Sequence, residues 1–532
     1  MESMSMIGNS QASLGSCNSE INRLFNLKNV EKCSKKLRIG FGGRFRLINC
    51  PKKLSLRVSA SKQPVPVLPE KFSGEESVNS KPKDGVKLFV GLPLDSVSDC
   101  NTVNHAKAIA AGLKALKLLG VEGVELPIWW GIAERETMGK YEWSGYLALA
   151  EMVQKVGLKL HVSLCFHSSK ESKIPLPKWV SQIGEVEPNI FFTDRSGHRY
   201  KECLSLAVDD LPVLNGRTPT QVYKDFFENF KASFSPFLGS TITGISIGLG
   251  PDGELRYPSY DQQSKNSNIR GAGEFQCYDI NMISNLKPQA EALGNPLWGL
   301  SGPHDAPSYD DSPILNNFFK DQGGSWETAY GDFFLSWYSS QLISHGDRLL
   351  SLASSTFSDS SVTISGKVPL MHSWYKTRSH SSELTAGYYN TDKRNGYEEV
   401  VQMFSRNSSK IILPGMDLSD DYQSNQTHSS PESLVEQIKT TSRKCGVEIS
   451  GQNLMVSGPP KGFEQIKKNL RGDQAVDLFT YQRMGSEFFS PDHFPSFTAF
   501  IRSLNEQEWL LDDLPTNEEE SRSRKNLQKQ TA

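Results

Sequence analysis

The sequence lacks the features that would place it in several large classes of protein. It has no run of about 18 apolar residues, the length that a helix needs to cross a membrane. Its eight cysteines form no CxxC pair, so clustered zinc-type ligands are missing too. Charge is balanced, with 58 Lys and Arg against 60 Asp and Glu, which argues against a nucleic-acid-binding protein. We therefore expect no metal, no cofactor, no nucleic-acid partner and no membrane partner.

The first 58 residues differ from the rest of the chain. They are rich in Ser and basic residues, their only acidic residues are Glu2, Glu20 and Glu31, and they hold no apolar core of a secretory signal. This composition predicts an organelle transit peptide at 1–58, with a disordered basic tail as the alternative. A linker rich in Pro, Ser and Lys is expected at 59–85. The C-terminal segment is 491–532, and its polar end, from about Asn517, is expected to be disordered.

Between these ends, short apolar runs alternate with segments of helical periodicity. Helices are predicted at 103–119, 146–156, 222–234 and 333–352, because apolar residues recur there at helical spacing. Strands are predicted at 86–90, 123–126, 158–167, 242–249, 362–370, 411–416, 447–450 and 476–481. Repeated strand–helix units imply a parallel sheet, and eight of them predict an α/β fold, a (β/α)8 TIM-type barrel with long loop insertions over 86–490. Such a barrel places its chemistry just beyond the carboxyl ends of the strands.

The segment Gly248–Gly253 fits the glycine pattern of a dinucleotide-binding turn after the fourth predicted strand. That motif needs a helix to begin there, so that the helix N-terminus faces the phosphates. Pro251 and Pro258 oppose a continuous helix, and we therefore reject the cofactor interpretation. The segment instead presents one carboxylate, Glu254, on a glycine-rich turn beside Arg256.

The full stretch GLGPDGELRYPSY closely resembles the acid-bearing signature of the β-amylases, glycoside hydrolases that release maltose from the non-reducing ends of α-1,4-glucans. The resemblance covers about residues 86–490 and includes GAGEFQCYD, FFLSWYSSQLISHGD and ELTAGYYN. Within the family, the segments GVKLFVGLPLDSVSDC, GGSWETAYGDFFLSWYSS and IILPGMDLSDD resemble a plastid branch described as inactive.

The resemblance implies an inverting mechanism with two carboxyl groups. One donates a proton to the leaving oxygen and the other, about 6.5–9.5 Å away, activates a water molecule on the opposite face of the sugar. By resemblance the proton donor is Glu254, and the base should lie in a Gly-Glu-Asn turn after the seventh strand. Here that turn reads Gly451-Gln452-Asn453, so the base position holds Gln452. A Gln amide can hydrogen-bond a water molecule but cannot accept its proton at neutral pH.

Other departures from the family pattern affect the same site. The lid after the third strand, His167–Ile174, is short and lacks the family's glycines; Pro127 replaces an Asp that contacts sugar hydroxyls; Pro414 replaces an inner-loop Thr; and Ser246 replaces a Glu. Asp417 could serve as a substitute base, although capping of a loop is the simpler interpretation. The resemblance implies that the remaining sugar-binding positions are His167, Arg256, Lys367, His372, Asn453 and Arg483.

Three functions remain open from the sequence. The first is a catalytically inactive plastid protein of starch metabolism that binds α-1,4-glucan, starch or maltose, or regulates active plastid starch hydrolases. The second is a maltose-releasing β-amylase of low rate. The third is a regulator with a vestigial sugar cleft that binds protein alone. The resemblance places the protein in the chloroplast stroma in each case.

Overall fold

The computed structural model describes residues 85–260, 271–454, 461–471 and 476–505, which lie in one compact unit. The predicted transit peptide, the predicted linker up to Asp84 and the polar end beyond Asn517 lie outside the described residues.

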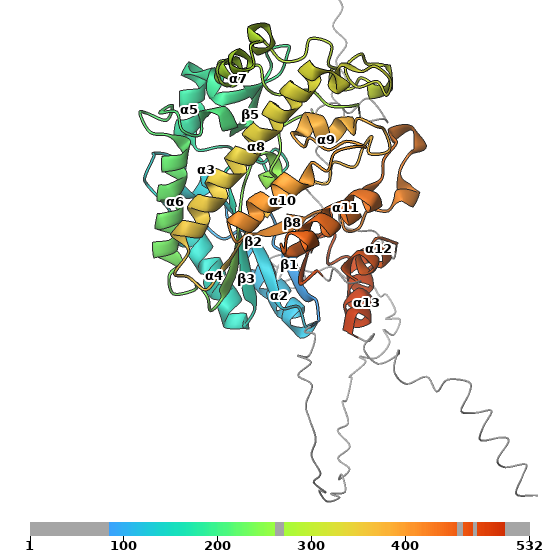
Figure 1. The fold of residues 1–532 in the computed structure, drawn as a ribbon. Coiled ribbons are helices and arrows are strands. Elements are labelled where there is room, and N and C mark those ends of the chain that lie inside the picture. Colours follow the sequence, from blue (N-terminus) through green and yellow to red (C-terminus); the bar gives the residue numbers. More distant parts are fainter. Residues whose placement is uncertain (1–84, 261–270, 455–460, 472–475, 506–532) are drawn as a thin grey trace, which may run out of the picture. The chain divides into compact units, whose positions relative to one another are not determined.

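A closed barrel of eight parallel strands forms the centre of this unit (Figure 1). Around the ring the order is β1-β10-β9-β8-β7-β6-β3-β2, with β1 and β2 paired to complete the circle. The eight strands are β1 (Lys87–Gly91), β2 (Gly123–Trp129), β3 (Lys159–Cys165), β6 (Ile242–Ile247), β7 (Thr363–Lys367), β8 (Lys410–Leu413), β9 (Ile449–Gln452) and β10 (Leu478–Tyr481). The predicted (β/α)8 fold is confirmed, and every predicted strand corresponds to one of these.

Helices lie outside the strands, and long insertions carry additional elements (Figure 1). The short strands β4 (Phe191–Thr193) and β5 (Arg199–Leu204) pair antiparallel in the insertion that follows β3. The α-helices are α2 (Ala106–Leu118), α3 (Trp130–Ala133), α4 (Ser144–Val156), α5 (Lys178–Val186), α6 (Pro219–Phe234), α7 (Ile280–Ala292), α8 (Ala329–Thr356), α9 (Ser381–Ala386), α10 (Tyr397–Arg406), α11 (Pro431–Lys444), α12 (Lys461–Leu470) and α13 (His493–Asn505).

Helix α6 shows how the sequence sets its local structure. Thr218 accepts a hydrogen bond from the backbone of Gln221, whose side chain accepts one from Thr218 N–H in return, so this capping box satisfies two free backbone donors. Pro219 occupies the first turn, where its missing N–H costs nothing. The helix then buries a row of phenylalanines against Trp143, whose ring centroid lies 5.3–6.0 Å from those of Phe226, Phe230 and Phe234.

The abundant aromatic residues therefore serve mainly as core. Trp130, Tyr146 and Phe226 are completely buried, and Trp130 also contacts Trp179 and Tyr223 edge to face. Such large rings dominate the energy of packing in a core. Trp129 is also buried, and it lines the cavity at the carboxyl ends of the strands as well.

Helix α13 continues the packed part of the chain beyond residue 490, the limit expected from the sequence. Its Phe497 is buried with a ring centroid 5.0 Å from that of Tyr481 in β10, and His493 Nε2 lies 3.0 Å from the Tyr481 hydroxyl. Helix α13 thus covers the strand that pairs with β1.

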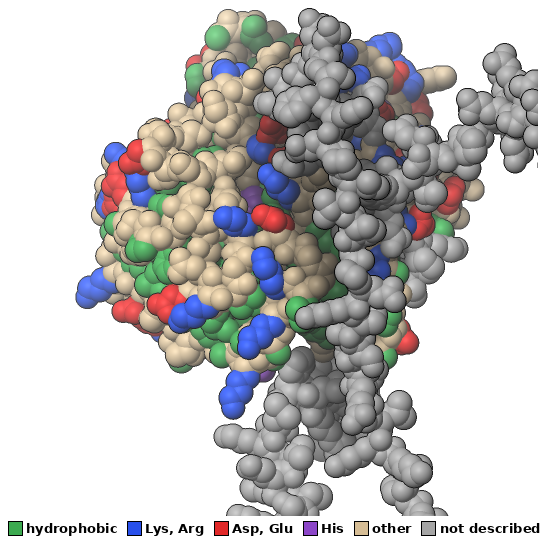
Figure 2. Space-filling view, turned by 90° about the horizontal axis from the view of Figure 1, so that it is seen from below, with side chains coloured by type: hydrophobic (Ala, Val, Ile, Leu, Met, Phe, Trp, Pro, Cys, Tyr) green, Lys and Arg blue, Asp and Glu red, His purple; other side chains and the backbone are tan. Residues whose placement is uncertain are grey.

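On the face drawn in Figure 2, the described Lys and Arg side chains lie scattered among acidic, polar and hydrophobic ones. They do not gather into one positive area in that view. Within the described residues, no helix combines the length and apolarity that a membrane crossing needs.

Leu164 in β3 is fully buried and offers a direct test of the barrel core. Leu164→Ala is expected to lower the free energy of unfolding by about 2–5 kcal/mol, because the lost methyl groups leave a cavity. The exposed Leu118, 88% accessible at the end of α2, is the matched control, and Leu118→Ala should change stability by less than about 0.5 kcal/mol. Denaturant unfolding of both variants checks this, and equal effects would contradict the assigned core.

Candidate active site

A cavity of about 630 Å³ opens at the carboxyl ends of the barrel strands. Trp129, Lys367 and Gln452 are the last residues of β2, β7 and β9, and all three line it. Parallel strands end at one side of a barrel, so residues distant in the sequence meet there. The structure brings all eight predicted site residues to this cavity: Glu254, Gln452, His167, Arg256, Lys367, His372, Asn453 and Arg483.

Glu254 is held by the turn after β6. No α-helix begins at the glycine motif; the chain makes one 3-10 turn, Pro251–Gly253, and Leu255 N–H then donates to Lys367 O at 2.8 Å. A Cβ added to Gly250 would lie 2.7 Å from the carbonyl oxygen of Glu254, and Gly253 has a φ of 77°. Both positions therefore require glycine.

The carboxylate of Glu254 is positioned by Arg256. Arg256 Nε donates to Glu254 Oε2 at 2.8 Å, and its Nη2 donates to Asp252 Oδ2 at 2.6 Å. Burial alone would lower the pKa of Arg256, but the two carboxylates outweigh it, so its pKa lies above the usual value and the guanidinium stays charged. Glu254 thus has a fixed orientation toward the cavity.

Gln452 is buried at the end of β9, the position at which the family resemblance predicts a base. Its backbone oxygen accepts a hydrogen bond from Met416 N–H at 3.0 Å, so the position itself is well anchored. The neighbouring Asn453 exchanges two hydrogen bonds with Gln482, at 2.8 and 2.6 Å. The turn therefore has an ordered framework but no proton acceptor of carboxylate strength at position 452.

Asp417 does not line the cavity. Its Oδ1 accepts a hydrogen bond from Leu454 N–H at 2.7 Å, which is the loop-capping role considered from the sequence. The local geometry therefore gives no support to Asp417 as a substitute base.

A buried acidic residue near the cavity, Glu125, was not predicted as a site residue from the sequence. Glu125 in β2 is 5% exposed, and its Oε2 lies 3.3 Å from both Arg483 Nη1 and Gln482 Nε2. Burial alone would raise the pKa of Glu125, but the charge of Arg483, a hydrogen bond from Ser163 and the charge of Lys367 outweigh it, and the pKa is lowered. The sequence did contain one signal for this residue, because Glu125 is a charged residue inside an otherwise apolar strand.

His167 and Trp129 form another wall of the cavity. Their ring centroids lie 5.3 Å apart in an edge-on contact, and Trp129 Nε1 donates to Leu94 O at 2.8 Å. Burial, reinforced by the charges of Lys367 and Arg256 against the opposing charge of Asp252, lowers the pKa of His167 to about 4. The ring is therefore neutral at pH 7.

The replacements predicted near the site have visible consequences. Pro127 is buried in β2, opposite Ser163 of β3, and offers no hydrogen-bonding side chain. The short lid is closed on itself, because Ser169 and Ile174 exchange backbone hydrogen bonds of 2.7 and 2.9 Å. Lys170 of this lid forms an ion pair with Glu202 of β5.

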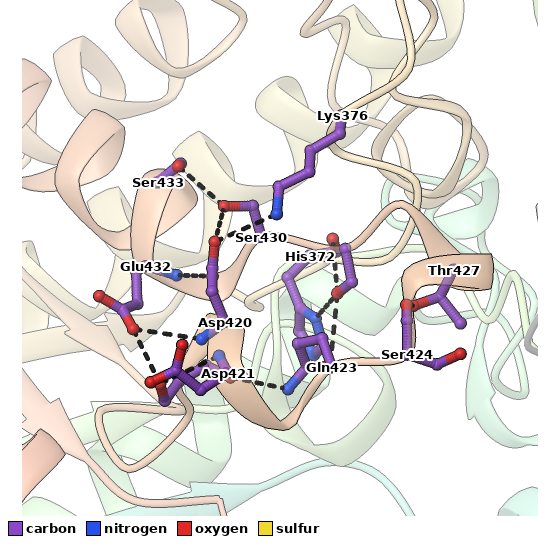
Figure 3. Close-up of polar contacts among 12 residues, drawn as sticks. His372, Lys376, Asp420, Asp421, Gln423, Ser424, Thr427, Ser430, Glu432 and Ser433 are labelled. Carbon is purple, nitrogen blue, oxygen red and sulfur yellow. Dashed lines mark hydrogen bonds and ion pairs between the residues drawn. The ribbon is translucent and has the colours of Figure 1, made fainter.

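The loop after β8 contributes Pro414 and Gly415 to the cavity and is tied to helix α11 (Figure 3). Asp420 accepts from Glu432 N–H at 3.1 Å and from Ser430 Oγ at 2.6 Å, while its own N–H donates to Glu432 Oε1 at 3.1 Å. Figure 3 also shows Lys376 reaching Asp420, and the two side chains form an ion pair of 3.4 Å. These reciprocal bonds join the loop to the first turn of α11.

Tyr309 also lines the cavity, from the insertion between β6 and β7, and no feature of the sequence pointed to it. Its hydroxyl donates to Asp194 Oδ2 at 2.9 Å, across 115 residues of chain. In the part of the chain that the structure describes, no group of three or more His, Cys, Asp or Glu side chains could hold a metal ion.

Proteins of known family are similar to this chain in sequence and in fold. The sequence profile of glycosyl hydrolase family 14 matches residues 89–508. The chain belongs to this family. It is 62% identical over 436 residues to "Inactive beta-amylase 9" of Arabidopsis thaliana, covering 82% of this chain and 80% of the relative. It is 42% identical to "Beta-amylase 2, chloroplastic" of Oryza sativa subsp. japonica, covering 82% and 80%.

The family includes a further relative described as inactive and a solved catalytic domain. "Inactive beta-amylase 4, chloroplastic" of Arabidopsis thaliana is 39% identical, with 79% of this chain and 82% of the relative covered. The crystal structure of the catalytic domain of β-amylase from Paenibacillus polymyxa superposes with a TM-score of 0.65 at 25% identity, covering 78% of this chain and 98% of that domain. The predicted membership of the β-amylase family is confirmed.

The buried His167 predicts how stability depends on pH. A histidine has a pKa of about 6.5 in the unfolded chain, and His167 has a pKa of about 4 when folded. As pH falls from about 6.5 to 4, the unfolded state binds a proton at this histidine that the folded state does not bind. The free energy of unfolding therefore decreases by up to about 1.4 kcal/mol per pH unit. His167→Gln should make this loss shallower in pH-dependent denaturant unfolding.

The exposed His198 is the matched control for this measurement, since its side chain is 69% accessible. His198→Gln should retain the pH slope of the unsubstituted protein. An identical slope for His167→Gln would contradict the assignment of His167 as a buried neutral ring.

Proposed function

We propose that this chain is a catalytically inactive family 14 protein that binds α-1,4-glucan in its cavity. The observation that carries this proposal is Gln452 at the end of β9, in the same cavity as Glu254. An inverting hydrolase needs a base for its water molecule and has no covalent intermediate that avoids this step. General-base help is worth about 10²–10⁴-fold in rate, or about 3–5 kcal/mol.

The remaining geometry supports binding without turnover. Glu254 and Arg256 keep their paired arrangement, and Lys367, Asn453 and Arg483 still present polar groups beside the wall of Trp129. Sugars are recognised by this combination of apolar wall and fixed polar groups. The lost Asp at Pro127 and the short lid remove contacts that would hold and enclose a reacting sugar.

We further propose that the protein acts in the plastid stroma, in starch metabolism. The composition of residues 1–58 supports import into an organelle, and two of the relatives above are described as chloroplastic. In this setting the protein acts by occupying glucan chains or by regulating active starch hydrolases.

Catalysis is tested by maltose release from soluble starch with the full chain. We expect no release that depends on Glu254, because the base is absent. The Gln452→Glu variant restores the missing carboxylate with almost no change in volume, and Gln452→Glu/Glu254→Gln is its matched control. Glu254-dependent release by the unsubstituted protein would establish the low-rate hydrolase instead and require a search for another base.

Glucan binding is tested by calorimetric titration with maltoheptaose. Lys367→Ala is expected to weaken binding by about tenfold or more, because a hydrogen bond to a charged group contributes about 1.5–3 kcal/mol. Lys114→Ala, at an exposed position on α2, is the control and should bind as the unsubstituted protein does. No detectable binding by the unsubstituted protein would favour the regulator that binds protein alone.

A further inference from the structure

A second cavity of about 470 Å³ adjoins the first and has a different character. The two cavities share Lys170, Tyr260 and Tyr309, so a ligand that lies in one can extend into the other. The hairpin of β4 and β5 supplies most of the second cavity through residues 197–202. The proposed glucan binding in the first cavity does not use residues 197–202.

Positive charge predominates in this second cavity. Lys170, Arg199 and Lys201 line it together with one carboxylate, Glu202, and Glu202 already pairs with Lys170. Within the described ranges, neither Arg199 nor Lys201 has a carboxylate within 4 Å. Among the Lys, Arg, Asp and Glu side chains that line the cavity, positive charges therefore outnumber negative ones by two.

The guanidinium of Arg199 has an unused donor. Its Nε is buried and donates to no atom of the described protein. A buried donor without a partner costs about 1–3 kcal/mol, so the hydrogen-bonding capacity of the Arg199 guanidinium is not fully used by the described protein. Arginine is suited to phosphate, because its planar fork can donate two parallel hydrogen bonds to the phosphate oxygens.

A phosphate monoester matches the cavity in charge and size. It carries about −1.5 to −2 charges at pH 7, close to the excess of two positive charges. The volume exceeds what a phosphate alone needs, which leaves room for the sugar that carries it. Tyr200, Tyr260 and Tyr309 line the cavity and are suited to contact that sugar. Burial raises the pKa of Tyr200, so its hydroxyl remains a hydrogen-bond donor at neutral pH.

We propose that the cavity bounded by Lys170, Arg199 and Lys201 binds a phosphate monoester carried by a glucan chain that lies in the neighbouring site. This inference rests on the proposed glucan binding and names the chemical form of the glucan. Free inorganic phosphate offers the same chemistry, and the experiment below separates the two sources.

Calorimetric titrations of the full chain would use maltoheptaose, maltoheptaose with a single phosphate monoester, and inorganic phosphate. The phosphorylated sugar is expected to bind about tenfold more tightly than maltoheptaose at low salt, with a smaller advantage at high salt because exposed charges are screened. Arg199→Gln/Lys201→Gln should abolish this advantage and leave maltoheptaose affinity unchanged. Unchanged maltoheptaose affinity also shows that the variant is folded.

Lys107→Gln/Lys114→Gln, which removes two exposed charges from α2, is the matched control and should retain the full advantage. Equal affinity for the two sugars would overturn the phosphate site while glucan binding stands. If neither sugar binds, the proposed glucan binding fails as well. In that case, inorganic phosphate binding that is lost in Arg199→Gln/Lys201→Gln would assign the cavity to free phosphate and overturn the glucan-borne form.

Discussion

Closure of the parallel barrel is the constraint on which the rest of the structure depends. β1 pairs with β10, with Val90 opposite Tyr481, so the two ends of the barrel sequence lie side by side. Arg483, just beyond β10, can then donate to the carbonyl of Leu92 across 391 positions of chain. Because every strand of the barrel runs in the same direction, the ring of carboxyl ends becomes a single wall of the cavity. An unclosed sheet would separate Glu125 from Arg483.

This closure also explains how the proposed loss of catalysis can leave the shape of the site unchanged. Gln452 fills nearly the volume of a glutamate, and its neighbours Asn453 and Gln482 remain joined by two hydrogen bonds. Beneath them, Glu125 compensates the charge of Arg483 in a buried setting, where an unpaired charge would cost several kcal/mol. The framework is therefore held by packing and paired charges, and the proposed absence of a catalytic carboxylate at position 452 disturbs neither.

The sequence predicted correctly those features that depend on short stretches of the chain. Apolar runs of strand length predicted all eight barrel strands, and the family resemblance predicted eight side chains that the structure gathers in one cavity. It missed contacts that depend on insertions, because a loop's path is set by what it packs against. Tyr309 reaches Asp194 across 115 residues, and the three-residue strand β4 is too short to show a period. Glu125 was missed because an acidic residue in a buried strand indicates a site only when the basic residue that pairs with it, here Arg483, is known.

The sequence by itself determined the fold class, which depends on periodicity, and through the family resemblance it led to the expectation that Glu254 holds the acid position and Gln452 the base position. Only the tertiary structure decided that Asp417 caps a loop, that Glu125 pairs with Arg483, and that Arg199 and Lys201 line a cavity beside the main one. These outcomes depend on distances between residues far apart in the chain. Coulombic and hydrogen-bond energies change over a few ångströms, and only the closed barrel with its packed insertions fixes those separations.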